Sequence, residues 1–179
     1  IRIINKNNIF SDETINVTWN EEIIYCSSSS RSSFESIEGL IEINKNFLSY
    51  IKKYNPKLII VLGDRYELLP IISQALLSKI PIAHISGGEI TEGAIDDKIR
   101  NMVSFSADIH LVAHSKAKNR LKNLLGEQNA EKIFVVGEPG LEAIRNTKLK
   151  TVQELSNKYK LNLDKKYIIC TLHPETNNN

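Results

Sequence analysis

The sequence predicts an α/β fold in which a Rossmann-like parallel sheet carries helices on both faces. Short aliphatic runs alternate with amphipathic segments four or more times along the 179 residues, and this alternation is typical of strand–helix–strand units. The run at 58–62, LIIVL, is continuous and rich in branched residues, as expected for a strand that is covered on both faces. Folds of this class bind ligands at the carboxyl ends of their strands.

The first predicted elements are a strand, a long helix and a second strand. The segment 21–30 reads as a short strand that runs into a serine-rich loop. Ser32 and Glu35 have the spacing of a capping box, which predicts a helix start, and the Asn55-Pro56 pair predicts its end. Apolar residues recur through this helix at helical spacing: Phe34, Ile37, Leu40, Ile41, Phe47, Leu48 and Ile51.

The later elements repeat the same alternation. Strands are expected at 82–85, 109–113, 132–137 and 167–172. Helices are expected near 66–79, at 95–105, after Ser115 as the N-cap, after Pro139 and within 148–164. In the helix at 95–105, the apolar residues Ile95, Ile99, Met102 and Val103 lie on one side.

The composition favours a soluble protein of the cytoplasm. The formal net charge is +2, so no electrostatic footprint for nucleic acid stands out. No apolar run approaches the roughly 20 residues that cross a bilayer, and no signal peptide is visible, so no membrane role is expected. Cys26 and Cys170 end apolar runs without a C-x-x-C motif, which indicates buried free thiols and no metal site. Because the chain opens without Met and stops directly after an apolar run, we expect a piece of a longer protein.

Acidic residues gather where two successive predicted strands end. Asp64 follows Gly63 after the strand at 58–62; it either caps the next helix or acts as an acid or base. Glu89, Asp96 and Asp97 follow the strand at 82–85. One aspartate at a helix start is explained by the macrodipole. Several carboxylates facing one crevice fit acid–base chemistry better.

Other residues near these strand ends are candidates for substrate contact. Arg65 either pairs with Glu67 or holds a phosphate by its planar fork. Gly87 and Gly88 allow a ligand to come close to the backbone, but no G-x-G-x-x-G motif supports NAD binding. Arg100 has i,i+4 spacing to Asp96.

The histidines divide into two kinds. His84 lies inside an apolar strand and is expected to be a satisfied core residue. His110 and His114 bracket another strand without a metal-ligand pairing. His173 ends a strand and precedes Pro174, which favours a site residue that is either catalytic or in contact with a phosphate.

Four motifs together resemble the hydrolysing UDP-N-acetylglucosamine 2-epimerase family, in its sialic and legionaminic acid branch. They are LGDRYE, HISGGEITEGAIDDKIR, VVGEPGLEAI and TLHPET, in the family's order and at about its spacing, and the resemblance covers nearly the whole chain. The resemblance implies two Rossmann-like domains of the glycosyltransferase-B type with the active site between them. Residues 1–150 would form most of the first domain without its opening strand. Residues 151–179 would form a connecting helix and the first strand of the second, nucleotide-binding domain.

The family reaction implies the chemistry that is expected here. The nucleoside diphosphate is eliminated in anti fashion across C1–C2, and water then adds in syn fashion to the glycal. UDP-N-acetylglucosamine would give N-acetylmannosamine and UDP, and a 2,4-diacetamido or a GDP-linked sugar is an alternative substrate. No metal or redox cofactor is needed. The resemblance also implies a homodimer as partner, and the 179 residues alone are expected to be inactive because half of the cleft is absent.

The resemblance also assigns roles to residues. Asp64 matches the catalytic aspartate, Arg65 the nucleotide-contacting arginine, Asp96 with Asp97 the acidic helix start, and His173 the histidine near the diphosphate. We expect Ser86, Gly87, Gly88 and Arg100 to line the substrate site with Arg65. Ser86 stands where many members carry glutamate, so Glu89 is the substitute candidate for that role.

Two other readings of the same sequence remain open. One is a glycosyltransferase of the same architecture, which would leave the C2 hydrogen untouched. The other is a non-catalytic, sugar-nucleotide-binding fragment.

Overall fold

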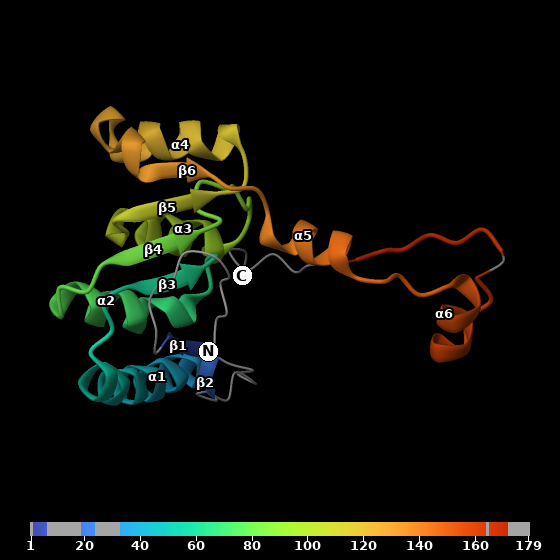
Figure 1. Cartoon of the computed structure of the whole chain (residues 1–179), viewed down its shortest axis with the longest axis horizontal. Coiled ribbons are helices and arrows are strands. Elements are labelled where there is room, and N and C mark those ends of the chain that lie inside the picture. The colour runs from blue at the N-terminus through green and yellow to red at the C-terminus, as the bar shows by residue number, and fades with distance from the viewer. Residues whose placement is uncertain (1, 7–18, 24–32, 164, 172–179) are drawn as a thin grey trace, which may run out of the picture. The chain divides into compact units, whose positions relative to one another are not determined.

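The computed structural model describes residues 2–6, 19–23, 33–163 and 165–171, with only the backbone described for 2–6, 19–23, 33 and 35. The chain divides into two compact units, residues 1–61 with 65–83, and residues 62–64 with 84–179. Four strands form the main sheet in the order β3-β4-β5-β6 (Figure 1). They are β3 (Ile59–Leu62), β4 (Ile82–Ile85), β5 (Ile109–Val112) and β6 (Ile133–Val135).

Between these strands in the chain lie α2 (Leu69–Leu77), α3 (Ile95–Ser106) and α4 (Ser115–Leu125), as the sequence predicts for a parallel sheet. Helix α1 (Ser33–Tyr54) precedes β3, and α5 (Pro139–Asn146) and α6 (Val152–Tyr159) follow β6. Two short 3₁₀ helices, η1 (Tyr66–Leu68) and η2 (Glu127–Lys132), precede α2 and β6. In β5 and β6 the register pairs His110 with Ile133 and Val112 with Val135, in parallel. None of the helices in the described part of the chain is long and apolar enough to cross a membrane.

The first strand segment differs from the prediction. Strand β2 covers Trp19–Ile23 and so begins before residue 21, where the prediction starts it, while residues 24–32 lie outside the described residues. It pairs antiparallel with β1 (Arg2–Lys6) in a separate two-stranded sheet. Two strands close in sequence can pair directly in antiparallel fashion, whereas a parallel pair needs a long crossover. Cys26 and the predicted cap Ser32 lie outside the described residues.

The core of the first unit is the contact between α1 and α2. The long predicted helix is confirmed. Of its predicted apolar residues Phe47 and Ile51 are buried, whereas Phe34, Ile37, Ile41 and Leu48 are exposed. The buried residues of α1 and α2 are Ile43, Phe47, Tyr50, Ile51, Pro70, Ile71, Ile72, Gln74 and Ala75. Gln74 Nε2 donates to the backbone oxygen of Asn44 at 2.8 Å.

The second unit has its core where α4 covers β5 and β6 (Figure 1). Val112, Ala117, Leu121 and Ile133 form a buried cluster there, and Leu125 packs against it. Each of the four is at most 1% exposed, so this contact removes nearly all of their apolar surface from water.

Two expectations about burial are wrong. Strand β3 is covered on one face only, since Ile60 and Leu62 are each 62% exposed while Val61 is buried; β3 is an edge strand of the four-stranded sheet. In α3, Ile95 and Met102 are exposed. The buried residues of α3 are Ile99, Arg100, Val103 and Ser104. This stripe is rotated from the predicted one because Arg100 and Ser104 turn inward to polar partners.

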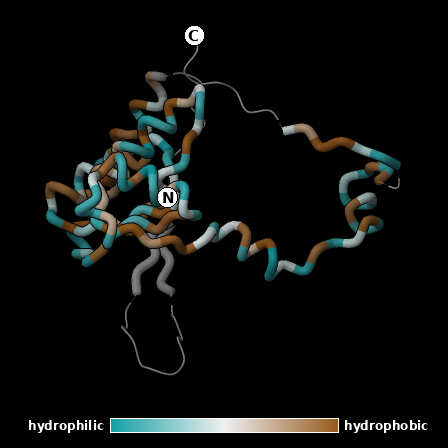
Figure 2. The backbone as a smooth tube through the Cα atoms, turned by 90° about the horizontal axis from the view of Figure 1, so that it is seen from above, coloured by the Kyte–Doolittle hydropathy of each residue, from teal (hydrophilic) through white to brown (hydrophobic). Residues whose placement is uncertain are grey.

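The segment after α6 also differs from the prediction. Residues 165–171 form no strand, and the thiol of Cys170 is exposed rather than buried. Ile168 and Ile169 are exposed as well. A strand is stable only when a neighbour satisfies its backbone groups, and no strand pairs with this segment within the described residues. Figure 2 shows that hydrophobic and hydrophilic residues alternate along α5 and α6, upstream of this segment.

Candidate functional site

Predicted site residues and two further polar residues lie where the four parallel strands end. Asp64 follows β3, Ser86 to Glu89 follow β4, His114 follows β5 and Glu138 follows β6. The carboxyl ends of parallel strands share one edge of a sheet, which is where this architecture binds its ligands. All of these residues belong to the second unit.

Arg100 joins the two aspartates that come from different elements. Its side chain is 7% exposed, and its guanidinium makes an ion pair with Asp64, which follows β3, and with Asp97 on α3 at 3.5 Å. Nη2 also donates to the hydroxyl of Thr91 at 2.9 Å. The backbone N–H of Thr91 donates to Asp97 Oδ1 at 3.1 Å. One cation therefore offsets the mutual repulsion of two carboxylates and ties the loop between β4 and α3 to both.

The observed ion pair of Arg100 on α3 differs from the predicted one. The helical partner of Arg100 is Asp97, at i,i+3, and not Asp96 at i,i+4. Asp96 and Asp97 both stand in the first turn of α3, where carboxylates interact favourably with the macrodipole, and both are half-buried. Arg100 Nε is buried with no hydrogen-bond partner among the described residues. The other two nitrogens of Arg100 already bind Asp64, Asp97 and Thr91. We therefore expect Arg100 to affect the substrate through Asp64 and Asp97.

Glu89 belongs to a second polar group. His114 Nε2 lies 3.1 Å from Glu89 Oε1, and Arg120 Nη1 lies 4.0 Å from Glu89 Oε2. Arg120 also donates to the backbone oxygen of Gly88 at 3.1 Å. The Glu89 side chain remains one-third exposed, so it is both held and accessible.

The paired glycines are packed against protein atoms. A Cβ on Gly87 would meet His84 Nδ1 at 2.9 Å and Ser104 Oγ at 3.0 Å. Gly88 has a φ of +77°, and a Cβ there would lie 2.5 Å from the backbone oxygen of Ala117. The motif thus lets the end of β4 approach α3 and α4 closely. Contact of these glycines with substrate stays a prediction.

His84 is a satisfied core residue, as predicted. It is fully buried. Its Nε2 lies 2.8 Å from the backbone oxygen of Gly63, and its Nδ1 lies 3.1 Å from Ser104 Oγ. Because a carbonyl can only accept, Nε2 carries the proton and donates. Burial lowers the pKa of His84 to about 4, with smaller contributions from His110 and Arg100. The neutral ring therefore links β4, α3 and the turn that precedes Asp64.

Ser86 meets a carboxylate from another strand. Its backbone is in the left-handed region, with a φ of 63°, which is uncommon for a residue other than glycine. The hydroxyl donates to Glu138 Oε2 at 3.5 Å. Glu138 Oε1 also accepts from the backbone N–H of Gly140 and so caps α5.

Two predicted residues stand apart from this group. Arg65 belongs to the other unit, and it makes an ion pair with Glu67, with its Nε 3.1 Å from Glu67 Oε2. This is the first of the two roles that the sequence allows for it. His173 lies outside the described residues.

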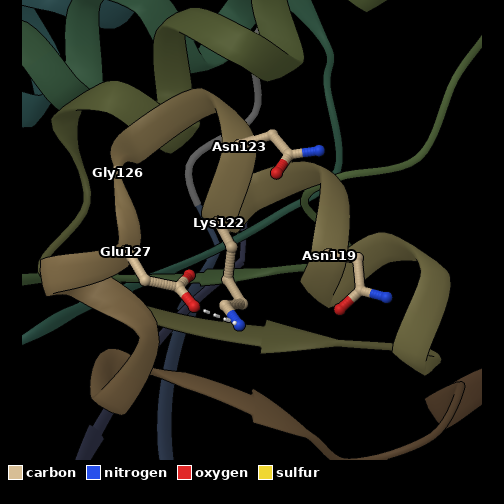
Figure 3. Close-up of a pocket in the computed structure, with 5 residues that line it drawn as sticks. All are labelled: Asn119, Lys122, Asn123, Gly126 and Glu127. Carbon is tan, nitrogen blue, oxygen red and sulfur yellow. Dashed lines mark ion pairs between the residues drawn. The ribbon is translucent and has the colours of Figure 1, made fainter.

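A pocket lies at the far end of α4 from His114. Figure 3 shows its lining side chains, with Lys122 Nζ 2.8 Å from Glu127 Oε1. The lining residues are Asn119, Lys122, Asn123, Gly126 and Glu127. None of the predicted site residues lines this pocket, and its one ion pair already satisfies its charges. It adds nothing to the candidate site.

Sequence reasoning missed four residues that hold the site together: Thr91, His114, Arg120 and Glu138. Thr91 and Glu138 lie within the quoted motifs, and His114 and Arg120 lie at and after the end of a predicted strand. Their roles depend on contacts with other elements, which the sequence does not show. The predicted helix cap is the clearest case. Ser115 is the first residue of α4, and the cap is His114, whose Nδ1 accepts from the backbone N–H of Ala117 at 3.1 Å. Serine is a common N-cap and histidine is not, so composition alone favours the wrong residue.

The sequence is similar to those of known proteins. The chain is 37% identical over 132 residues to a GDP/UDP-N,N'-diacetylbacillosamine 2-epimerase (hydrolyzing) of Campylobacter jejuni, a match that covers 74% of this chain and 34% of the relative. It is 34% identical over 128 residues to a UDP-N,N'-diacetylbacillosamine 2-epimerase (hydrolyzing) of Legionella pneumophila, covering 72% of this chain and 33% of the relative. The chain therefore spans about a third of the length of the curated relatives that it matches.

A solved structure and a protein family complete the comparison. The UDP-GlcNAc 2-epimerase of Neisseria meningitidis, crystallised with UDP-GlcNAc, superimposes with a TM-score of 0.59 at 20% identity. The match covers 76% of this chain and 38% of that one, and it shows a shared fold. Residues 24–179 match the family described as UDP-N-acetylglucosamine 2-epimerase. The chain belongs to the UDP-N-acetylglucosamine 2-epimerase family.

Proposed function

We propose that the full-length protein carrying this sequence is a hydrolysing 2-epimerase of nucleotide-linked N-acetylamino sugars. The observation that carries the proposal is the set of carboxylates at the strand ends: Asp64 and Asp97 share Arg100, and Glu89 lies beside His114. Inversion at C2 of a sugar needs one group to remove a proton and another to return it on the opposite face. Carboxylates held in two separate groups are suited to that work.

The proposed reaction has two steps, an elimination and an addition of water. In the first, a base takes the C2 proton, the C–H electrons form the C1–C2 double bond, and the C1–O bond breaks to release the nucleoside diphosphate. In the second, the oxygen of water bonds to C1 as one of its O–H bonds breaks and gives its proton to a base, while an acid on the protein supplies a proton to C2 on the other face. The products are the free 2-epimer and the nucleoside diphosphate.

We assign the roles from the contacts of each carboxylate. Glu89 is the C2 base, because it is accessible and is held on one oxygen by an imidazole. Asp64 returns the proton, from the end of the neighbouring strand. Asp97 accepts from Arg100 and from the Thr91 N–H, which suits a role in holding Arg100. Asp96 is the remaining candidate for water activation. His173 and Arg65 are assigned to the diphosphate.

The substrate is UDP-N-acetylglucosamine or a 2,4-diacetamido sugar linked to UDP or GDP. The names of the Campylobacter and Legionella relatives support the diacetamido sugars, and the family description supports UDP-N-acetylglucosamine. The free sugar would serve sialic or legionaminic acid synthesis. These candidates are distinguished by supplying each one to the same enzyme.

Replacement of Asp64 tests the proposal. Asp64→Asn keeps the shape of the side chain but cannot exchange a proton, so kcat/KM should fall by about 100-fold or more. Asp108→Asn is the matched control, because Asp108 directly precedes β5 at the opposite edge of the sheet and is exposed. Both variants are checked for folding by circular dichroism. Normal turnover by a folded Asp64→Asn protein would rule out the assigned role.

A further inference from the structure

We propose that His114 is a positioning residue that aims the Glu89 carboxylate from the start of α4. The inference deepens the proposed function and rests on it, because Glu89 is the residue assigned to the C2 proton. It is carried by two contacts of one ring: His114 Nδ1 to the backbone nitrogen of Ala117, and His114 Nε2 to Glu89 Oε1, both at 3.1 Å.

The first contact fixes which nitrogen of His114 carries the proton. A backbone N–H can only donate, so Nδ1 must accept from Ala117 and must be unprotonated. In a neutral imidazole the proton is then on Nε2, the nitrogen that faces Glu89. The helix cap therefore selects the tautomer that donates a hydrogen bond to the carboxylate.

The neighbouring contacts hold the rest of the glutamate in place. Arg120, almost two turns along α4, donates to the backbone oxygen of Gly88, the residue before Glu89. Its Nη1 lies 4.0 Å from Glu89 Oε2. Gly88 itself packs against the backbone of Ala117, with no room for a Cβ. Contacts with the first two turns of α4 thus hold both the backbone of this loop and the Glu89 carboxylate in place.

The Glu89 carboxylate remains accessible to a substrate. The side chains of His114 and Glu89 are 48% and 33% exposed, so neither contact seals the carboxylate from a substrate. Removal of a residue that orients a metal ligand typically changes activity by about 10- to 100-fold, and small displacements of a reacting group have effects of up to about 100-fold. We expect an effect of this size for His114.

Substitution of His114 by asparagine separates the two contacts. Asparagine is a good N-cap, so His114→Asn keeps an acceptor for the Ala117 N–H and removes the Nε2–H donor. In the full-length protein kcat should fall by about 10- to 100-fold, while KM stays within about twofold and the thermal unfolding midpoint stays unchanged. His114→Ala removes the cap as well and should also lower that midpoint. Lys116→Asn, an exposed site on the same turn of α4, is the matched control and should change neither quantity.

Two kinetic results would overturn the inference. One is an unchanged kcat in His114→Asn, since the donor would then be dispensable. The other is a rise in KM at constant kcat, since His114 would then act only in substrate binding.

A spectroscopic measurement separates failure of this inference from failure of the proposed function. ¹⁵N-edited NMR of the His114 ring should show the proton on Nε2. The Nε2–H resonance should shift in Glu89→Gln and should not shift in Glu92→Gln, an exposed site in the same loop. A proton on Nδ1, or no shift in Glu89→Gln, would refute the contact whatever the enzyme does. Absence of turnover on every sugar nucleotide would refute the proposed function and leave this result standing.

Discussion

At the scale of the residue, His84 shows how a buried polar group can serve a site without entering it. Its ring accepts from Ser104 on α3 and donates to Gly63, the residue before Asp64. Both nitrogens are therefore used by the fold, and burial of the ring favours its neutral form by lowering its pKa. The sequence predicts the burial of His84 from its apolar neighbours. It cannot predict the partners, because Gly63 and Ser104 are about 20 residues away on either side.

The neutrality of His84 predicts a loss of stability in acid. The pKa of His84 is 6.5 when unfolded and about 4 in the fold, so its contribution is complete above pH 6.5 and is lost as the pH falls towards 4. Between pH 7.5 and 5 this loss is about 2 kcal/mol in the free energy of unfolding.

Urea unfolding at the two pH values measures that loss. Burial also lowers the pKa of His110, and that residue adds acid sensitivity in the same direction. The comparison is therefore made with His84→Gln, which keeps His110 and should show the smaller change. If the free energy of unfolding fell equally in both proteins, His84 would not be the source of the acid sensitivity.

At the scale of the element, the sequence predicts strands better than it predicts which side of a helix is buried. Strand β4 has the bounds expected from its apolar run, because Pro81 and the glycine pair delimit it. The predicted buried side of α3 is wrong, because Arg100 and Ser104 are buried by polar partners on other elements. The predicted strand at 167–172 is wrong over its described residues, 167–171, because a strand depends on a neighbouring strand that its own sequence does not reveal.

The contact between the glycine pair and α4 can be tested with two substitutions. Gly88 and Gly137 both have positive φ, but a Cβ on Gly88 would lie 2.5 Å from the Ala117 oxygen, whereas nothing lies within 4 Å of one on Gly137. Gly137→Ala should therefore cost only the backbone term, about 1 kcal/mol. Gly88→Ala should cost roughly 2 kcal/mol more, from overpacking. Chemical denaturation measures both free energies. Equal losses would mean that α4 can move away from the loop, and the close approach would not be a constraint.

At the scale of the whole molecule, the family follows from the order of four motifs, and the parallel sheet follows from the alternation of strands and helices. The comparisons confirm the first and the structure confirms the second. The motifs also place the candidate carboxylates at the strand ends. They do not reveal the division into an Arg100 group and a His114 group, because each group joins several elements. The chain spans about a third of its relatives, so the activity of the whole protein is the claim that most needs a direct measurement.

That measurement is the fate of the C2 hydrogen. The full-length protein is incubated with UDP-N-acetylglucosamine in D₂O, and then with the 2,4-diacetamido and GDP-linked sugars, while the sugar is followed by proton NMR. The account predicts release of a free 2-epimer that carries deuterium at C2 from at least one of these substrates, because a base on the protein removes that proton and solvent supplies its replacement. Transfer of the sugar to an acceptor with the C2 hydrogen retained, or no reaction with any of the substrates, would contradict it.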